Sequence, residues 1–463
     1  NWAPSFYRVL MKNLFPPVTI AAFLCFGIIA IQLLWQKPEP RQVDERFYLV
    51  LAHDLYEFGV FTSATARGTG QSGEVPQPDN YIVPAYPALL AAIAVFDPEM
   101  RKQMRCAVGP IGDCMATIPL SLILIQAVLL AGATLFTFNA YRHLNPRPAF
   151  AYTALVCLLA VGLQARLATS ILPDGLSLAA FMVLAGCLVT ALRSKGAQSW
   201  LAVGAVIGLG ALIRPSTFYL VFMMIPVVLF ATRSVRGSIA MLIGFTIVLT
   251  PWILRNVLIV DSLSFTGSYG GITLAQRVAY NAMTPVEWGV ALIYWLPDFG
   301  DSLAASLFPI EAYQRLDFST QNGFYRIGNT ALMAEALSRA GGPQGLTGVL
   351  IKDWILAHPL THIATTIPIF LRGLWVAKYV GLAAILLLIP VVTGLWRQGR
   401  AKNFLILASP FFLMAGFHAG ISINIPRYNY SLVIIYAALF AYAGFYIWDR
   451  VNRAPTSTAI NQD

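Results

Sequence analysis

The sequence predicts an all-α integral membrane protein, and three observations support that prediction. Hydrophobic residues make up 57% of the 463 residues and charged residues only 11%. The apolar residues gather in runs long enough to cross a hydrocarbon core, which takes about 20 helical residues. Lys and Arg gather in every second connection between runs. A water-soluble protein of this composition would expose much apolar surface, so the ordinary soluble classes are excluded.

Apolar runs mark about ten candidate membrane spans. They cover residues 17–35, 117–141, 149–165, 176–193, 198–213, 216–232, 237–254, 375–396, 403–421 and 428–448. A helix near 360–373 is either a further span or an interfacial helix. We therefore expect a single polytopic domain over residues 1–463, with about 10–12 transmembrane helices.

Basic residues predict that both termini lie in the cytoplasm, because short loops rich in Lys and Arg stay on that side. These residues are Arg8, Lys12, Arg142, Arg147, Arg193, Lys195, Arg233, Arg236, Arg397, Arg400, Lys402, Arg450 and Arg453. The net charge of +10 reflects this topology and attraction to anionic membrane lipids, and gives no reason to expect nucleic acid. Two long segments, 36–116 and 255–374, then lie outside the cytoplasm.

Both long segments contain pieces with helical periodicity. Residues 44–58 predict a helix along the membrane surface, with Phe47, Leu51 and Leu55 on one side. A second apolar helix is expected from Pro84, with proline in its first turn. The second segment has amphipathic or apolar pieces near 286–308, 325–340 and 345–358. Such helices could roof a lateral cavity.

Two of the five cysteines, Cys106 and Cys114, lie in the first long segment. In an oxidising compartment their spacing is typical of a disulfide that closes a short turn. A metal pair is the alternative, but no His or second Cys pair accompanies them. No P-loop, dinucleotide fingerprint or zinc motif occurs in a credible context. The Gly204-x-x-x-Gly208 spacing indicates close helix packing.

Short motifs along the chain resemble those of bacterial members of the GT-C glycosyltransferase superfamily. They are Asp44-Glu45-x-x-Tyr48, Pro84-x-Tyr86-Pro87-x-Leu-Leu, Leu172-Pro173-Asp174-Gly175, Arg214-Pro215, Pro251-Trp252-x-x-Arg255-Asn256 and Pro426-Arg427-Tyr428. Similar in style are the dolichyl-phosphate-mannose protein mannosyltransferase-like proteins and the aminoarabinose transferases that modify lipid A. Those proteins generally carry a sizeable C-terminal soluble domain. None is expected here, because about 15 residues follow the last apolar run.

The resemblance implies a polyprenyl-phosphate-sugar donor and an inverting transfer outside the cytoplasm. The acceptor is a lipid, a glycan or a protein, and the family style favours a bacterial inner membrane, with the active site facing the periplasm. Such a transfer needs a base near the acceptor hydroxyl, and a carboxylate in a partly desolvated cleft can serve. Asp44 is the predicted base.

Asp174 is the second carboxylate expected in the cavity. It would orient the acceptor or the sugar, or bind a divalent ion, the one cofactor that the sequence leaves open. Helix capping is the alternative for both carboxylates. Glu45 points about 100° away from Asp44 on a helix, so we assign it to substrate binding and not to proton transfer.

Three arginines are predicted to hold the lipid phosphate, because Arg can fork two hydrogen bonds to phosphate oxygens. Arg214, Arg255 and Arg427 each lie at the outer end of a span, where the topology disfavours a positive charge. The alternative is that they snorkel to headgroups or pair with an acidic loop residue such as Asp261. The binding set is completed by Tyr48, His53, Tyr86 and Tyr428, with Arg372, Lys378 and His418 as weaker candidates.

Two other functions remain open. A lipid-linked-sugar flippase would also use arginines in a cavity, but it would place charges near the middle of spans. An O-antigen-ligase-like enzyme would take a lipid diphosphate donor with similar arginines. A purely structural scaffold is disfavoured by the set of motifs.

Overall fold

A computed structural model of the chain describes residues 17–36, 43–68, 75–109, 117–194, 196–267 and 269–452. Within these ranges every regular element is a helix, and none is a strand. This confirms the predicted fold class. Arg8, Lys12, Lys195, Arg453 and Cys114 lie outside the described residues.

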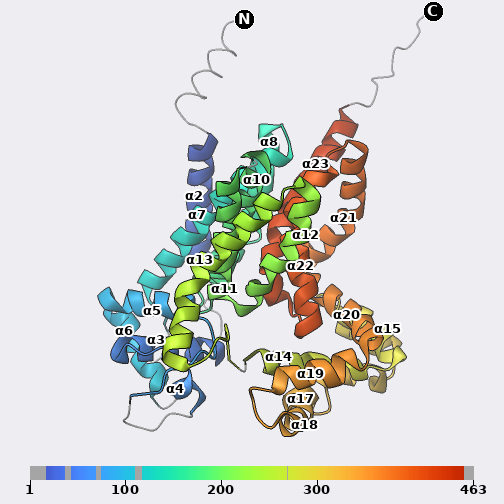
Figure 1. The fold of residues 1–463 in the computed structure, drawn as a ribbon. Helices are drawn as coiled ribbons and strands as arrows, with labels where there is room; N and C mark the ends of the chain where they lie inside the picture. Colours follow the sequence, from blue (N-terminus) through green and yellow to red (C-terminus); the bar gives the residue numbers. More distant parts are fainter. Residues whose placement is uncertain are drawn as a thin grey trace, which may run out of the picture.

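Long helices form a bundle, and shorter helices cover one end of it (Figure 1). Eight helical stretches in the described ranges are long and apolar enough to cross a membrane, or nine if the bent pair Leu346–Leu356 and Pro359–Leu374 forms one span. The eight are α2 (Pro17–Trp35), α7 (Leu120–Leu144), α10 (Asp174–Ser194), η2 with α12 (Pro215–Tyr219 and Leu220–Thr232), α13 (Val235–Val260), α21 (Tyr379–Arg397), α22 (Ala401–Ile421) and η7 with α23 (Pro426–Leu432 and Val433–Val451). The chain is a multi-pass membrane protein.

Two of the ten predicted spans are shorter helices. The run at 149–165 is divided into α8 (Pro148–Ala160) and α9 (Leu163–Ala168), because Gly162 between them has a φ of +71° and breaks the helix. The run at 198–213 is α11 (Ala197–Ile213), which has 17 residues. These two helices account for the difference between the predicted and observed numbers of long spans.

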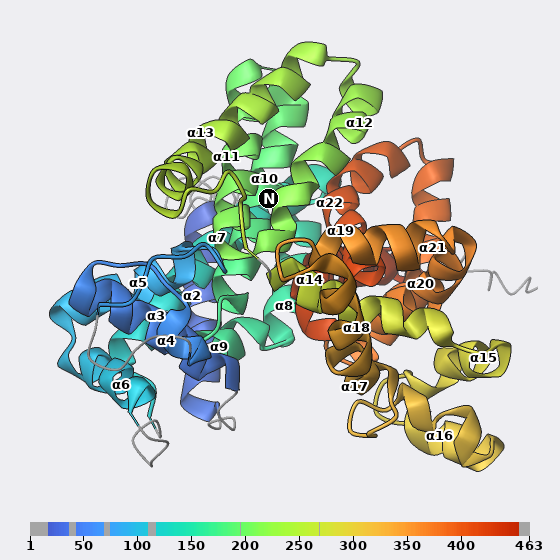
Figure 2. The same cartoon turned by 60° about the horizontal axis from the view of Figure 1, so that its bottom comes forward.

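The described chain begins and ends at the same end of the bundle, since α2 starts and α23 finishes there (Figure 1). The short helices of the two long segments lie at the other end, which we call the site end (Figure 1). Figure 2 shows them as two groups on opposite sides of the site end.

The first group of short helices follows α2. It consists of α3 (Val43–Phe58), α4 (Ala64–Arg67), α5 (Ala85–Phe96) and α6 (Pro98–Val108). Apolar residues of α3, α5 and α6 form a core of their own that includes Leu49, Leu90 and Met104. The helices predicted at 44–58 and after Pro84 are confirmed as α3 and α5. Cys106 in α6 is disulfide-bonded, while the predicted partner Cys114 is outside the described residues.

The second group lies between α13 and α21. It contains α14 (Tyr269–Val278), η3 (Ala279–Ala282), α15 (Pro285–Tyr294), α16 (Gly300–Leu307), η4 (Ile310–Ala312), η5 (Gln314–Leu316), α17 (Phe324–Asn329), α18 (Ala331–Ala340), α19 (Leu346–Leu350), the π-helical turn η6 (Ile351–Leu356) and α20 (Pro359–Leu374). The fully buried Arg277 of α14 joins this group to the bundle, because its guanidinium donates to the carbonyl of Ala419 at 2.6 Å and to that of His362 at 3.0 Å.

Helices α11 and α13 pack at very short range through glycine. A Cβ atom added to Gly204 would lie 1.8 Å from the carbonyl oxygen of Met241, and one added to Gly244 would lie 2.0 Å from that of Leu201. Only glycine leaves room for these backbone contacts. The packing role predicted for the Gly204-x-x-x-Gly208 spacing is thus confirmed for Gly204.

We expect Gly204→Ala to lower the unfolding free energy by about 1–3 kcal/mol, because the new methyl group must push α13 away from α11. Gly394→Ala is the control, since a Cβ at Gly394 in α21 meets nothing within 4 Å. Unfolding by SDS titration in mixed micelles measures both. Equal stabilities of the two variants would contradict the packing role.

Candidate active site

Two carboxylates and two arginines meet at the site end and form a continuous chain of ion pairs. The Nη1 of Arg427 donates to Oδ2 of Asp44 at 3.2 Å, and its Nε donates to Oδ2 of Asp174 at 3.1 Å. The Nη2 of Arg214 donates to the other oxygen of Asp174, Oδ1, at 2.9 Å. We call these four residues the charge cluster. Its formal charges sum to zero.

Proline places three of the four residues at breaks between helices. Asp174 begins α10 directly after Pro173, and its carboxylate is favoured by the positive end of the helix dipole. Arg214 ends α11 in an extended conformation, which the following Pro215 favours. Arg427 follows Pro426, the first residue of η7. The charged side chains therefore lie at the ends of spans and not within them.

The two carboxylates of the cluster differ strongly in exposure. The side chain of Asp174 is 1% exposed, and both of its oxygens accept hydrogen bonds from arginine. The side chain of Asp44 is 58% exposed, although it too pairs with Arg427. Asp44 is thus the carboxylate that a molecule arriving from outside can reach, and Asp174 is the one that fixes the arginines.

Glu45 contacts the backbone that leads into Asp174 of the charge cluster. The residue is 4% exposed, and its Oε1 accepts a hydrogen bond from the backbone N–H of Ile171 at 3.0 Å. Ile171 precedes the segment that leads into Asp174. Glu45 therefore fastens α3 to the start of α10, which places Asp44 and Asp174 on the same side. We propose a positioning role for Glu45 from this contact, and the predicted substrate contact stays a prediction.

Aromatic side chains lie beside Asp44. The rings of Tyr48 and Tyr86 meet edge to face with centroids 5.4 Å apart, and those of Tyr81 and Tyr269 do so at 5.6 Å. Burial raises the pKa of both Tyr48 and Tyr269, with a further contribution from Asp44 and an opposing one from Arg214. Both phenols therefore stay neutral at physiological pH and can act as hydrogen-bond donors. Tyr269 belongs to none of the sequence motifs described above, so it was not predicted.

Tyr428 and His418 support the arginine side of the cluster. The guanidinium of Arg214 lies over the Tyr428 ring, 5.5 Å from its centroid. His418 is 6% exposed and hydrogen-bonds through its two ring nitrogens to Ser216 and Asn429, each at 3.0 Å. His418 thus joins the segment after Arg214 to the segment after Arg427.

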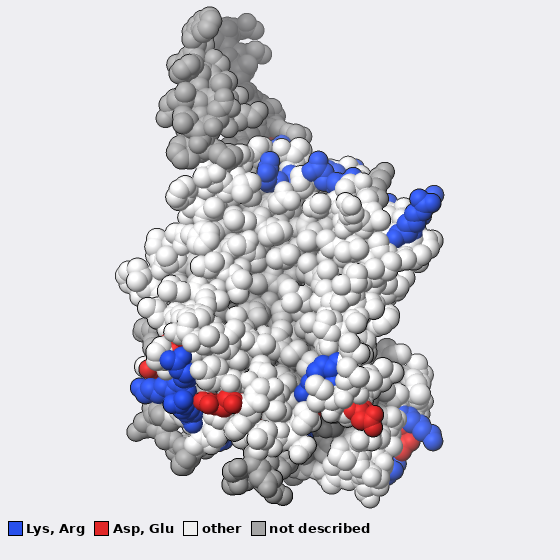
Figure 3. All heavy atoms as spheres, turned by 60° about the vertical axis from the view of Figure 1, so that its left-hand side comes forward, with Lys and Arg blue, Asp and Glu red and all other residues white. Residues whose placement is uncertain are grey.

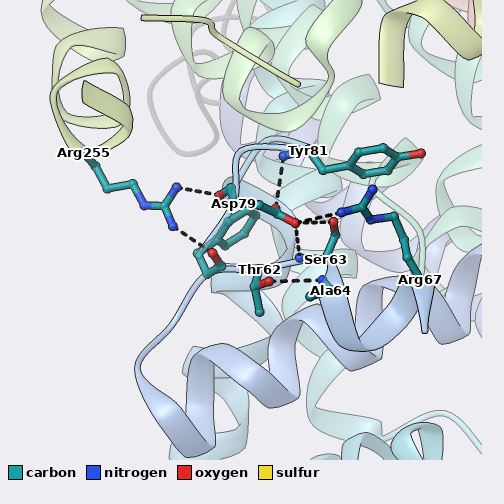
Figure 4. Close-up of polar contacts among 8 residues, drawn as sticks. Thr62, Ser63, Ala64, Arg67, Asp79, Tyr81 and Arg255 are labelled. Carbon is teal, nitrogen blue, oxygen red and sulfur yellow. Dashed lines mark hydrogen bonds and ion pairs between the residues drawn. The ribbon is translucent and has the colours of Figure 1, made fainter. Parts of the chain in front are cut away.

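Arg255 lies outside the charge cluster and holds the first long segment to α13 (Figure 4). Its guanidinium donates to the carbonyl oxygens of Asp79 at 2.6 Å and of Phe61 at 2.8 Å, and it stacks over Trp252 at 5.0 Å. The Asp79 carboxylate accepts from the backbone N–H and the hydroxyl of Ser63. We therefore propose an anchoring role for Arg255, and the predicted phosphate contact stays a prediction. Asp79 was not predicted.

His53 is also apart from the cluster. Its Nδ1 lies 3.1 Å from Oδ1 of Asp54, a carboxylate that is 1% exposed, and its ring packs against Phe58. His53 lies more than two helical turns along α3 from Asp44. No hydrogen bond or ion pair given for His53 reaches a member of the cluster, so the predicted substrate contact stays a prediction.

The weaker candidates Lys378 and Arg372 differ from each other. Lys378 forms an ion pair with Asp298 at 2.7 Å. Arg372, near the end of α20, is 8% exposed and lies over the rings of Phe318 at 4.0 Å and Trp295 at 4.9 Å. Each ring contact contributes about 0.5–2 kcal/mol, whereas burying an ion costs several kcal/mol. The charge of Arg372 is therefore only partly compensated.

No group of three or more His, Cys, Asp or Glu side chains in the described part of the chain could hold a metal ion. Asp174, which the sequence offered as a possible ligand, has both oxygens engaged by Arg214 and Arg427.

Comparison with known proteins bears on this arrangement. Residues 118–254, which include Asp174 and Arg214, match the family described as dolichyl-phosphate-mannose-protein mannosyltransferase. The predicted resemblance to GT-C glycosyltransferases is confirmed. This family of membrane glycosyltransferases uses lipid-phosphate sugar donors. No curated protein matches the chain.

One solved structure with similarity is the Archaeoglobus fulgidus oligosaccharyltransferase in complex with zinc and sulfate, with a TM-score of 0.43 and 14% identity. The match covers 94% of this chain and 49% of that one, so this chain spans about half the length of the archaeal enzyme.

Asp174→Asn should lower the unfolding free energy by about 3 kcal/mol, because it leaves two partly buried arginines without their shared carboxylate. Asp449→Asn is the matched control: Asp449 pairs with Arg147 at 2.8 Å, but both side chains are more than one-third exposed and such pairs contribute little. SDS titration in mixed micelles compares the two. A loss no larger than that of the control would show that Asp174 does not fix the arginines.

Arg255→Met should free the first long segment without affecting the charge cluster. The variant loses both hydrogen bonds to the carbonyls of Phe61 and Asp79, so backbone amides near residues 61–81 should exchange with deuterium about tenfold faster or more. Hydrogen-exchange mass spectrometry measures this. Unchanged exchange in this segment, with weaker binding of a lipid phosphate, would restore the predicted phosphate role.

Proposed function

We propose that the chain transfers a sugar from a polyprenyl-phosphate-linked donor to a hydroxyl of a lipid, glycan or protein acceptor. The transfer inverts the configuration at the anomeric carbon, and Asp44 acts as the base. The observation that carries this proposal is the charge cluster, in which an exposed carboxylate shares an arginine with a buried one. The match to a family of lipid-phosphate-dependent mannosyltransferases supports the same chemistry.

The reaction has one nucleophilic step. Asp44 accepts the proton of the acceptor hydroxyl while the hydroxyl oxygen attacks the anomeric carbon on the face opposite the phosphate. The bond between that carbon and the phosphate oxygen breaks, and its electron pair leaves with the phosphate. The products are the glycosylated acceptor, a protonated Asp44 and a polyprenyl phosphate that has gained one negative charge.

Because Asp44 and Asp174 share Arg427, proton uptake by Asp44 is coupled to the departure of the phosphate. While Asp44 is ionised, Arg427 divides its hydrogen bonds between Asp44 and Asp174. Once Asp44 takes up the proton, its attraction for Arg427 falls, because the carboxyl group has become neutral. The positive charge of Arg427 is then less compensated at the moment when negative charge grows on the leaving phosphate. This change would stabilise the transition state more than the bound substrate.

Charge distribution supports an extracytoplasmic site. Arg233, Arg236, Arg397 and Arg400 lie at the ends of helices opposite the site end. On the face drawn in Figure 3, Lys and Arg appear at both ends of the molecule, whereas acidic side chains appear only at the site end. Basic loops stay in the cytoplasm, so the charge cluster would face the periplasm of a bacterial inner membrane, with both termini inside.

The position of the cluster also favours transfer over transport. A flippase would need charged groups along the path through the membrane, whereas the four residues of the cluster lie at helix ends. The band between the two ends of the molecule on the face in Figure 3 shows few charged side chains. An O-antigen-ligase-like enzyme would differ in its diphosphate donor, which a donor comparison can separate.

Asp44→Asn should reduce transfer on the order of a hundredfold or more, because the amide cannot accept the hydroxyl proton. Purified protein in nanodiscs is incubated with radiolabelled polyprenyl-phosphate sugars and a membrane-lipid extract, and labelled product is separated by chromatography. A polyprenyl-diphosphate sugar is tested in parallel. Asp261→Asn is the control, since Asp261 caps the end of α13 in a left-handed conformation that Asn also adopts readily.

The proposal fails for Asp44 if the Asn variant keeps near-full activity. Label that crosses the bilayer without changing its chemical attachment would indicate a flippase. Activity with the diphosphate donor alone would indicate the ligase-like reaction.

A further inference from the structure

Arg372 is a buried cation without a carboxylate partner in the described part of the chain. It is 8% exposed, and the phenol of Tyr280 is the neutral polar group beside its guanidinium. Its buried Nη1 makes no hydrogen bond of normal geometry. No salt bridge among the described residues involves Arg372. Its surroundings are the rings of Trp295 and Phe318 and an apolar core formed by α15, α17, α20 and η7.

A second buried arginine shows how this fold satisfies such a group when its role is structural. Arg277, which is 0% exposed, donates to the Ala419 carbonyl, the Asn281 side chain and the hydroxyl of Thr366, among other neutral acceptors. No Arg277 nitrogen is among the buried atoms that lack a partner. Arg372 has the Tyr280 phenol in place of this set of acceptors, so its guanidinium is less fully hydrogen-bonded than that of Arg277.

Arg372 is rigidly joined to the segment that carries Arg427. The residue after it, Gly373, accepts a hydrogen bond from the Asn429 side chain at 3.1 Å. A Cβ atom at Gly373 would lie 2.2 Å from Nδ2 of Asn424, so the segments that carry these two residues are in direct contact there. Tyr428 belongs to the same apolar core as Trp295 and Phe318 and also lies under Arg214 of the charge cluster.

Charge balance decides what Arg372 can bind. The cluster already neutralises itself, because its two arginines are matched by Asp44 and Asp174. A sugar phosphodiester brings one negative charge, and its release as a phosphate monoester adds a second. Arg372 would balance the first of these charges, and the positive charge that Arg427 gains in effect when Asp44 is protonated would balance the second.

We propose that Arg372 is the residue that binds the phosphate of the lipid-linked donor and of the polyprenyl phosphate product. This inference rests on the proposed function. The rings of Trp295 and Phe318 hold the guanidinium plane in place, and Nη1 is the donor that remains for a phosphate oxygen. Among the arginines predicted for this role, Arg214 and Arg427 are ion-paired and Arg255 is bound to backbone carbonyls.

The test measures binding and does not need turnover. Wild type, Arg372→Gln and Arg372→Lys are purified in nanodiscs made of a zwitterionic lipid, and the affinity for undecaprenyl phosphate is compared with that for undecaprenol. Arg315→Gln is the matched control: Arg315 also stacks on a ring, Phe324 at 4.3 Å, but it has a carboxylate partner in Glu287 at 3.4 Å.

We expect Arg372→Gln to weaken undecaprenyl phosphate about tenfold or more and to leave undecaprenol binding unchanged. Arg372→Lys should recover only part of the affinity, because an ammonium group lacks the planar fork. Arg315→Gln should affect the two ligands equally. Equal loss of both ligands in Arg372→Gln, or no loss of either, would overturn the proposal.

Competition identifies the source of the phosphate. Undecaprenyl phosphate should be displaced by the donor sugar lipid at micromolar levels, while inorganic phosphate and phosphatidylglycerol should displace it poorly. Equal displacement by phosphatidylglycerol would mark a general headgroup site and overturn the assignment to the donor.

The two proposals can fail separately. If transfer is absent with every donor but the phosphate-dependent loss in Arg372→Gln remains, the proposed function is wrong and the phosphate site stands. If transfer occurs and Arg372→Gln keeps wild-type affinity, the phosphate site is wrong and the function stands.

Discussion

The candidate site depends on one shared side chain, the guanidinium of Arg427. It contacts Asp44 at the start of α3 and Asp174 at the start of α10, residues that lie 383 and 253 positions away in the chain. Within the described residues, the side-chain hydrogen bonds of Asp44 and Asp174 go to arginine and not from one carboxylate to the other. Arg427 is therefore the group that holds an exposed acid at a fixed place relative to a buried one. Arg214 completes the arrangement by neutralising Asp174 from the other side.

Much of the fold was predictable because it rests on local signals. Apolar runs gave the long helices, and the side-by-side spacing of Phe47, Leu51 and Leu55 gave α3. The helix break at Gly162 was missed, since an apolar run has the same appearance whether it forms one helix or two. The residues of the cluster were predicted from motifs, and the structure brings Asp44, Asp174, Arg214 and Arg427 together.

The division of labour among the arginines could not be predicted. Arg214, Arg255 and Arg427 all follow the same rule, a positive charge at the outer end of a span, and the sequence gives no further distinction. What separates them is the partner that the fold supplies: carboxylates for Arg214 and Arg427, backbone carbonyls of residues 61 and 79 for Arg255. Glu45 likewise differs from Asp44 only by the 100° turn of a helix, which directs it to the Ile171 amide.

The long sequence separations in the charge cluster have a consequence for the order in which the protein matures. Asp174 and Arg214 are 40 residues apart and lie on adjacent elements, so they can pair as soon as α10 and α11 have been inserted. Arg427 enters after the other three residues of the cluster, with the span formed by η7 and α23. Since chains are made from the N-terminus onward, a nascent chain that still lacks this span has Asp44 but no group to hold it. The charge cluster is thus completed only when the helix that begins at η7 is inserted.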